Sequence, residues 1–570
     1  MATNFLYAAS LKTANGTKWG YINEKGEFEI QPEFNFALDF QKNGLATVEK
    51  DGKYGCIDKY GIIRIPFLFE STIEFSEGRA AVVYAGGFHV IDEQGTILTK
   101  KPYNYIGMFY DGRALVSDQD KESSFRYGYL NTHGDIAIPI QFETASDFTN
   151  GIAIVKLSDL QFALIDRRGN IVNVYPYFFV GYYGENLLAY RKDPSDLYGY
   201  IDLRGNLVIS PRYRVAQAFE DSRAVVTETE DLQNRYGLID RTGNYIIKPR
   251  YNDIMPLGEH RFAVGKALDE DKPYLGSRYA LANWKGECLT DFIYDHISRF
   301  EQGIASVGDG KQAFFIDRTG NRARGLPVVR GADNVTLVGK LVRAMKGTRV
   351  AYFDRRGNLV WKQNTIIPLT SRYRVIEKQY EPNKDYLVYY PQVDGIKNEK
   401  AQVTVNNRLK ELSKLKKIEP TEQLDYSYVG DFNVSFFQNN LLVIELFGYE
   451  YYFGAAHGMP TKIYVTINLI SGRIYALEDL FKKGSNYLAR VSSIIEEMIS
   501  TDPQYDYVFP GAFQGITNDQ PFYVDQDHLY IFFAPYQIGP YAAGFPTFKI
   551  PYTSIFDILD TKGEFWLSFH

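Results

Sequence analysis

The side chains that could do chemistry in this sequence are few, and most of them stand alone. Among the seven histidines, His457 is the strongest catalytic candidate, because glycines surround it in the stretch 454–458. A nucleophile or a general base needs partners within hydrogen-bond reach, and neither a Ser-His-Asp nor a Cys-His set can be assembled around His457. The sequence favours the alternative, a tight glycine-rich turn in which the histidine caps a neighbouring carbonyl group.

Metal and thiol chemistry have no better support. Asp525, Asp527 and His528 resemble one corner of a metal site, but a polar turn that leads into a strand accounts for them more simply. Cys56 and Cys288 are far apart, so they form neither a disulfide framework nor a metal cluster. We therefore predict no catalytic residue, no metal and no cofactor, and we expect that the chain is not an enzyme.

The aromatic side chains are a second kind of candidate, because flat rings can bind ligands without doing chemistry. They make up 15% of the sequence, with 45 Tyr and 39 Phe, which also favours β structure. If exposed, a recurring row of rings would suit stacking on sugars or on a partner protein; a ladder inside the repeats is the interpretation we favour. Tyr536 and Tyr541, in a Gly-Pro loop, pose the same choice between a contact site and loop packing. The row consists of Trp19, Tyr54, Tyr127, Tyr198 and Tyr236.

Charge and hydropathy exclude two kinds of partner. The formal net charge is −6 and no block of Lys and Arg stands out, so nucleic acid is not expected to bind. No run of about 18 apolar residues occurs, so no membrane span is predicted. Residues 1–18 lack the basic and apolar segments of a signal peptide, which favours the cytoplasm.

The elements that position these side chains follow from an internal repeat. The pattern aromatic-Gly-x-Ile-Asp-x-x-Gly begins at Trp19, and its turn occurs in ten copies with a period of 34 to 43 residues. An Asp or Asn at the first position of a type I turn accepts from the turn backbone, and the Gly at the fourth adopts a positive φ. Such a turn joins two strands in a β-hairpin. The ten turns are 23–26, 58–61, 92–95, 131–134, 166–169, 202–205, 240–243, 283–286, 317–320 and 354–357.

Two further landmarks complete the predicted unit. In the first eight copies an aromatic residue stands eight positions after the turn glycine, often with a proline before it, as at Pro32, Pro211 and Pro249. Because proline lacks an N–H group, we expect it to end the second strand of the hairpin. A Gly-x-Ala sequence then precedes a third strand, such as 46–49 or 80–84. Each repeat is therefore predicted to have three strands, and the last two copies, which lose the aromatic, are typical of capping repeats.

This pattern resembles the WG-repeat family of bacteria, named for the pair that stands here at Trp19 and Gly20. The resemblance covers about residues 17–365 and implies β-rich repeats with no assigned chemistry, although most copies here have Tyr or Phe in place of Trp. Three strands and ten copies fit an open, solenoid-like array, because propellers normally have four strands in each blade and four to eight blades. A β-propeller stays the alternative.

The periodicity stops near Trp361, and the rest of the sequence has a different character. Stretches 398–416 and 487–499 have helical spacing. The chain is therefore divided into a repeat array, residues 1–365, and an α+β domain, residues 366–570, in which two helices pack against one antiparallel sheet. The predicted strands are 386–393, 431–437, 441–447, 462–469, 474–477, 528–534 and 547–551.

Four strings occur in order in this second region: 454–458, 468–472, 477–481 and 536–544. Together they resemble the RsiV-like domain that is found beside anti-sigma factors and in some membrane-anchored polysaccharide deacetylases. The resemblance implies an extracytoplasmic sensor that binds a protein; the metal-binding catalytic domain of the deacetylases is a separate unit, of which this sequence holds no trace. That implied role conflicts with the cytoplasmic location expected from the N-terminus.

Three functions fit these observations. The first is a non-catalytic interaction scaffold that binds a protein through the repeats and the C-terminal domain. The second is a cell-envelope glycan binder, for example of peptidoglycan, that uses exposed aromatic rings. The third is a hydrolase with a site near His457. Exposure of the aromatic row distinguishes the first two.

Overall fold

The computed structural model describes residues 5–119, 124–229 and 235–570. These residues form two compact units, one of residues 1–9 and 19–362 and one of residues 10–18 and 363–570. The N-terminal stretch 10–18 therefore belongs with the C-terminal region, although nothing in its sequence indicates this. No helix in the described part of the chain has the length and apolarity that a membrane crossing needs.

The first unit is a series of small antiparallel sheets that follow one another along the chain, ten of them within the described residues. This confirms the mainly β class and the repeated architecture. Most sheets have four strands, not three, and the additional strand is often short. The strands are β1 (Tyr7–Thr13), β2 (Gly16–Ile22), β3 (Phe28–Phe34); β4 (Phe36–Ala37), β5 (Ala46–Lys50), β6 (Lys53–Ile57), β7 (Ile63–Phe69); β8 (Arg79–Tyr84), β9 (Gly87–Asp92); β10 (Tyr105–Tyr110), β11 (Arg113–Gln119), β12 (Phe125–Asn131), β13 (Ile136–Phe142); β14 (Thr144–Ala145), β15 (Ile152–Ser158), β16 (Gln161–Asp166), β17 (Ile171–Tyr175); β18 (Phe179–Gly184), β19 (Leu187–Arg191), β20 (Tyr198–Asp202), β21 (Leu207–Tyr213); β22 (Val215–Ala216), β23 (Arg223–Thr227), β24 (Tyr236–Asp240), β25 (Tyr245–Tyr251); β26 (Asp253–Gly258), β27 (Arg261–Ala267), β28 (Ser277–Asn283); β29 (His296–Ile297), β30 (Ile304–Gly308), β31 (Gln312–Asp317), β32 (Val329–Arg330); β33 (Asn334–Val338), β34 (Leu341–Lys346), β35 (Arg349–Phe353) and β36 (Leu359–Lys362).

The predicted turn is present in every copy. In the second copy the N–H of Gly61 donates to the carbonyl oxygen of Asp58 at 2.9 Å, and Gly61 has a φ of +78°. The Asp58 side chain accepts from the N–H groups of Tyr60 and Ile62 at 2.9 and 3.1 Å. The other nine turns have the same backbone hydrogen bond and the same positive φ at glycine. A purely local pattern, Asx followed three residues later by Gly, is therefore sufficient to form this hairpin turn.

The sheets are offset from the sequence repeat. The predicted third strand, for example β5, pairs with the hairpin of the following copy, where it lies beside β6. The last strand of one sheet also runs into the first strand of the next with one residue between them: β13 ends at Phe142 and β14 begins at Thr144. Each sequence repeat thus contributes to two sheets, and this link supplies the fourth strand.

The predicted role of proline is wrong, because Pro32, Pro211 and Pro249 lie inside strands β3, β21 and β25 and do not end them. In the second copy, Pro66 lies in the same way inside β7. β7 is an edge strand, where a missing N–H group breaks no ladder bond. It also bulges between the residues that face Tyr54 and Cys56. A methyl group added at Gly55, between those two residues, would lie 2.6 Å from the carbonyl oxygen of Ile65. The glycine of the Trp-Gly pair is therefore needed to make room for the proline bulge.

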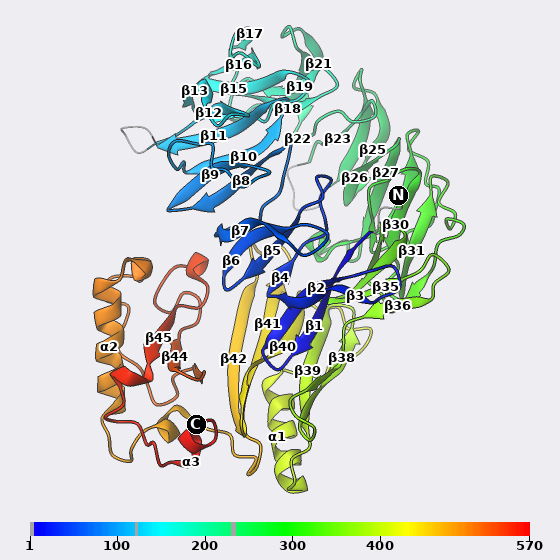
Figure 1. Cartoon of the computed structure of the whole chain (residues 1–570). Coiled ribbons are helices and arrows are strands. Elements are labelled where there is room, and N and C mark those ends of the chain that lie inside the picture. The colour runs from blue at the N-terminus through cyan, green and yellow to red at the C-terminus, as the bar shows by residue number, and fades with distance from the viewer. Residues whose placement is uncertain (1–4, 120–123, 230–234) are drawn as a thin grey trace. The chain divides into compact units, whose positions relative to one another are not determined.

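The first unit closes on itself, because the contact that joins neighbouring repeats also joins the two ends. A methyl group added at the turn glycine Gly169 would lie 3.2 Å from Ile138 of the copy before. In the first copy, the same addition at Gly26 would lie 2.3 Å from the carbonyl oxygen of Val360 in the last copy. The sheets therefore follow one another from β3 round to β36, which lies beside the first repeat (Figure 1). A closed ring corresponds to the propeller alternative, whereas an open solenoid has free ends.

Three further contacts stabilise the closure. The Tyr352 hydroxyl donates to the carbonyl oxygen of Ala8 at 2.8 Å, and the rings of Tyr7 and Tyr352 lie 5.5 Å apart. The ammonium group of Lys340 is 2.8 Å from a carboxylate oxygen of Glu24. The ends of the array thus share hydrogen-bonded, apolar and charged contacts.

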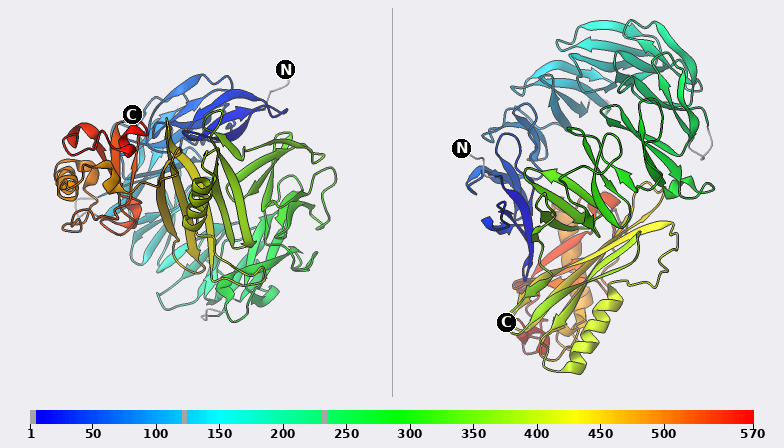
Figure 2. Two further views of the ribbon diagram at one scale, coloured as in Figure 1. Left: turned by 90° about the horizontal axis from the view of Figure 1, so that it is seen from below. Right: turned by 90° about the vertical axis from the view of Figure 1, so that its right-hand side faces the viewer.

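The second unit is α+β and is built in layers. A six-stranded sheet carries α1 on one face (Figure 2), where Val405 and Leu409 pack against strand residues such as Val393 and Ile444. A separate three-stranded sheet and α2 share the second apolar core with residues of β41. The elements are β37 (Ile366–Pro368), β38 (Arg374–Asn383), β39 (Tyr386–Asp394), α1 (Glu399–Leu412), β40 (Tyr426–Gln438), β41 (Leu441–Tyr452), β42 (Met459–Asn468), α2 (Tyr487–Thr501), β43 (Phe522–Val524), β44 (His528–Phe532), β45 (Thr547–Pro551) and α3 (Glu564–Leu567).

Three details of this unit differ from the prediction. The strands β44 and β45 belong to the separate three-stranded sheet, whereas a single sheet was predicted. The large sheet is mixed, because β39 and β40 are parallel. The helix α1 connects them, and parallel neighbours need a crossover connection of this kind. Residues 474–477 form a single bridge, Ile474 to Ile467, followed by a 3₁₀ turn at Leu477–Leu480. The two predicted helices are present and end within a few residues of the expected positions.

Within this unit, Lys12 is buried between two carboxylates. Its ammonium nitrogen lies 2.8 Å from Asp431 and 3.2 Å from Glu377, and it donates to the carbonyl oxygen of Phe432 at 2.7 Å. The three charged side chains are only 3, 8 and 5% exposed, in that order. The N-terminal stretch is thus held to the C-terminal sheet by a buried ion triad.

Candidate functional site

The aromatic row of the repeats is an internal feature. Tyr54 faces Phe69 across the hairpin, so the residue before the glycine pairs with the aromatic that stands eight positions after the turn. Such cross-strand aromatic pairs stabilise sheets. All five members of the row are half-buried and pack against the cores of their repeats. The other pairs are Trp19 with Phe34, Tyr127 with Phe142, Tyr198 with Tyr213 and Tyr236 with Tyr251.

The three candidates of the C-terminal domain come together. His457 lies in the loop between β41 and β42, whereas Tyr536 and Tyr541 lie in the loop between β44 and β45. The Tyr541 ring stacks on the His457 imidazole with 4.1 Å between centroids, and the Tyr536 hydroxyl is 3.2 Å from Nε2 of His457. Residues about 80 positions apart in sequence therefore form one aromatic cluster.

Tyr449 is a fourth member, which the sequence reasoning missed. Its hydroxyl accepts from the N–H of Gly458 at 2.8 Å, while the Tyr541 hydroxyl donates to the carbonyl oxygen of Gly458 at 2.9 Å. Both hydrogen bonds are made to the backbone of Gly458, so they fix the conformation of the loop that carries His457. A signal was present in the sequence, since Tyr449 begins the aromatic-rich run that precedes the glycines of residues 454–458.

The cluster is accessible, unlike the row in the repeats. Tyr536 is 50% exposed and Tyr449 is 44% exposed, and His457 is exposed as well. Tyr536 has a φ of +68°, a left-handed conformation that side chains other than glycine rarely adopt. Backbone strain of this kind is often found where a side chain must be aimed in a particular direction.

The hydrogen bonds orient the imidazole of the cluster. Nδ1 of His457 is 3.0 Å from the carbonyl oxygen of Gly458, which can only accept, so Nδ1 carries a proton. Nε2 lies 3.2 Å from the Tyr536 hydroxyl, which can donate or accept. Partial desolvation and the hydrogen bond to Tyr449 raise the pKa of Tyr541, which stays a neutral phenol near pH 7. The arrangement therefore offers fixed aromatic faces and neutral hydroxyl groups.

The polar group at residues 525–528 is a turn. One carboxylate oxygen of Asp525 accepts from the N–H groups of Asp527 and His528 at 2.8 and 2.7 Å, and the other accepts from the Tyr530 hydroxyl at 2.7 Å. The acceptor capacity of Asp525 is thus used by its own turn and by β44. No cluster of His, Cys, Asp and Glu with the geometry of a metal site occurs among the described residues.

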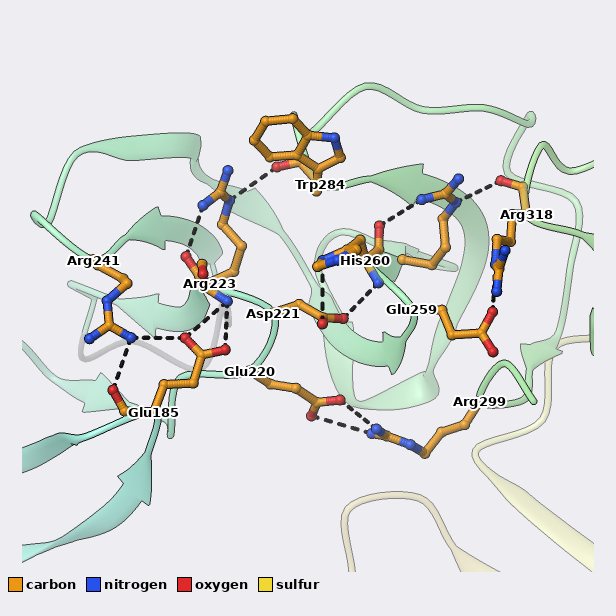
Figure 3. Close-up of polar contacts among 12 residues, drawn as sticks. Glu185, Glu220, Asp221, Arg223, Arg241, Glu259, His260, Trp284, Arg299 and Arg318 are labelled. Atoms are coloured by element: carbon orange, nitrogen blue, oxygen red, sulfur yellow. Dashed lines mark hydrogen bonds and ion pairs between the residues drawn. The ribbon is translucent and has the colours of Figure 1, made fainter. Parts of the chain in front are cut away.

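A band of polar contacts joins neighbouring repeats (Figure 3). Asp221 has a left-handed φ of 52° in a hairpin turn and accepts from the N–H of His260, in the same turn of the next sheet, at 2.6 Å. Glu185 accepts in the same way from Ser222 at 2.9 Å. Glu259 also binds the guanidinium of Arg318 at 2.6 Å. These groups pair with one another from sheet to sheet, so the band connects neighbouring repeats.

Models of two protein families match the chain. The model of the WG containing repeat matches residues 19–54, 54–87, 90–121, 127–160, 198–229 and 236–264, which are six of the ten copies. The model of a protein of unknown function, DUF3298, matches residues 478–553. The chain therefore carries WG repeats and a C-terminal DUF3298 region. This confirms the family resemblances drawn from the sequence, and the RsiV-like description is consistent with the DUF3298 match.

Solved structures resemble parts of the chain. A DUF3298 family member from Bacteroides fragilis is 18% identical over 33% of this chain and 92% of its own, with a TM-score of 0.25. A DUF3298 family protein from Pseudomonas aeruginosa is also 18% identical, over 34% and 95%, with a TM-score of 0.27. The C-terminal WD40 domain of Sif2 is 11% identical over 54% and 97%, with a TM-score of 0.27. No curated protein matches.

Proposed function

We propose that this protein is a non-catalytic binding protein, in which the WG-repeat ring is a scaffold and the aromatic cluster of the C-terminal domain contacts a partner protein. The observation that carries the proposal is the set of exposed Tyr449, His457 and Tyr536 with the half-buried Tyr541, whose polar atoms are hydrogen-bonded within the set or to Gly458. Tyrosine rings that are fixed before binding lose little entropy on association, and tyrosine is enriched at interface hot spots.

Two alternatives have less support. A glycan binder was expected to use an exposed row of rings in the repeats, and those rings are half-buried against their own cores. A hydrolase near His457 would need a nucleophile on one imidazole nitrogen and an orienting carboxylate or amide side chain on the other, whereas the neighbours of His457 are a tyrosine hydroxyl and the carbonyl oxygen of Gly458. Binding through the C-terminal cluster requires neither feature.

The test is a quantitative pull-down with the full chain, from a lysate of the source cells that includes the wall fraction. We expect a discrete protein whose recovery falls about tenfold or more in the Tyr536→Ala, Tyr541→Ala double variant. Tyr60→Ala is the matched control, because Tyr60 is 72% exposed but lies in a repeat turn, far from the cluster in sequence. Equal recovery by the wild type and the double variant would contradict the proposal, and so would recovery of wall glycan alone.

A further inference from the structure

The fifth copy of the repeat differs from its neighbours. The WG model matches the copies on either side of it but leaves residues 161–197 unmatched. Ala163 stands where the adjacent copies have Gly128 and Gly199, and the strand that faces it, β17, lacks the proline bulge. This agrees with the steric role of the glycine, since a residue with a Cβ leaves no room for the bulge. An aromatic-rich stretch, 175–183, then follows in place of the usual corner.

A groove is present at this divergent copy. It consists of two hollows of about 250 and about 400 Å³, which share Ser146, Ile154 and Tyr183 in their walls. Phe162 and Phe179 line the larger hollow, with 6.1 Å between ring centroids and an angle of 60°. The combined volume lies in the range of sites for small molecules, and the walls are mostly apolar, as such sites usually are.

One charge in this groove is not neutralised by the protein. Asp147 lines the smaller hollow, and its carboxylate makes no hydrogen bond or ion pair with any residue that the structure describes. The Asp147 side chain is exposed at the mouth of the hollow, and the protein atoms around it raise its pKa by partial desolvation. Lys156, in the wall of the larger hollow, is already paired with Glu143 at 2.8 Å and with Asp159 at 3.3 Å. The groove therefore combines aromatic walls with one exposed carboxylate that has no described protein partner.

We propose that this groove binds a small organic cation, an amine that carries an aromatic or branched aliphatic group. The ammonium group would pair with Asp147, and the apolar group would lie against Phe162, Phe179 and Tyr183. A charge-assisted hydrogen bond at a partly desolvated carboxylate is stronger than a neutral one, and aromatic faces attract cations in addition. This site is in the repeats and does not depend on the aromatic cluster of the C-terminal domain.

The experiment is a calorimetric titration of the full chain with 2-phenylethylamine, with 2-phenylethanol as the neutral analogue and 3-phenylpropanoate as the anionic one. We expect the amine to bind with a Kd below about 1 mM and the alcohol about tenfold more weakly. The anion should not bind. Equal affinity for the three compounds, or no binding of the amine up to about 5 mM, would overturn the proposal.

Variants locate the binding in the groove. Asp147→Asn should weaken amine binding about tenfold and leave the alcohol unchanged, while Asp147→Glu should restore most of the amine affinity. Thr144→Trp, at an exposed position of the wall, should abolish binding of both compounds by filling the groove. Asp135→Asn is the control, because Asp135 is an exposed carboxylate that pairs with Lys100 elsewhere. Unchanged amine affinity in Asp147→Asn, with the fold intact by circular dichroism, would also overturn the proposal.

Discussion

The two units of this chain reach a defined structure by different means. The repeat unit relies on short local motifs that recur along the chain, and its charged pairs are half-buried or exposed: Lys53 and Glu70, for example, are 44 and 48% exposed. The C-terminal unit relies on a single buried group of charges, Lys12 with Glu377 and Asp431, all less than a tenth exposed. When one copy of a repeated motif is lost, the other copies still stabilise the repeat unit. The buried cation Lys12 occurs once, and no other group can neutralise its two carboxylates. Removing Lys12 should therefore lower the stability of the C-terminal unit strongly, whereas a single substitution in the repeat unit should cost less.

The largest effect is expected from Lys12→Met. The substitution removes the cation between two buried carboxylates, and breaking a buried ion group in this way costs about 3–5 kcal/mol. Urea unfolding combined with hydrogen exchange of peptides from residues 363–570 would measure it. Lys53→Met is the matched control, with an expected loss below about 1 kcal/mol because that pair is exposed. Similar losses in the two variants would break the contrast between the units.

A smaller but clear effect is expected from Gly199→Ala. The added methyl group would lie 2.5 Å from the carbonyl oxygen of Ile209, so the facing strand must move, at a cost of about 2–3 kcal/mol. Gly44→Ala tests the conformational requirement for glycine separately from the steric one. Gly44 has a φ of +81° and no atom close to its Cβ position. That variant should lose about 1 kcal/mol. Thermal unfolding compares the two, and the reverse order would show that the proline bulge does not need the glycine.

The ring closure can be tested through its charged pair. Between internal repeats the turn residues Arg241 and Arg318 bind the acids Glu185 and Glu259, but at the closure the charges are exchanged, with Lys340 opposite Glu24. This exchange favours pairing of the ends with each other.

Lys340→Glu should lower the unfolding midpoint by a few degrees at low salt, and the double variant with Glu24→Lys should restore it. High salt should reduce both changes, because the pair is exposed. A double variant no more stable than the single one would argue against a closed ring in solution.

The smallest effect is expected at the Asx turns on acidification. The side chain of Asn170, and then its backbone N–H, lower the pKa of Asp166. A folded-state pKa below the unfolded value of about 3.9 contributes stability above that pH, which is lost as the pH falls through the folded pKa. Asp166→Asn should leave stability at pH 7 almost unchanged, because Asn23 and Asn131 form the same turn in other copies. It should also make the loss of stability below about pH 4 less steep. An identical acid transition in wild type and variant would show that this turn does not contribute.

The parts of the fold that were predictable are those determined by neighbouring residues. The ten turns depend on an Asx and a Gly three positions apart, and they form as expected, as do the helices α1 and α2. The proline was misinterpreted because its effect depends on the strand beside it: Pro66 is tolerated at a sheet edge opposite Gly55, a relation that spans eleven positions of sequence. The choice between an exposed and an internal aromatic row also depended on packing that no local pattern contains.

The sequence by itself determined the repeat, its turn, the α+β character of the second region, and the membership of His457, Tyr536 and Tyr541 in the set of candidates. Only the tertiary structure decided that these three rings meet, that the array closes, that Lys12 belongs to the C-terminal unit, and that Asp147 faces an apolar groove. The physical reason is the range of the interactions. Turns and helices are formed by hydrogen bonds within about four residues, whereas stacking, ring closure and burial of charge join residues that are distant in the chain.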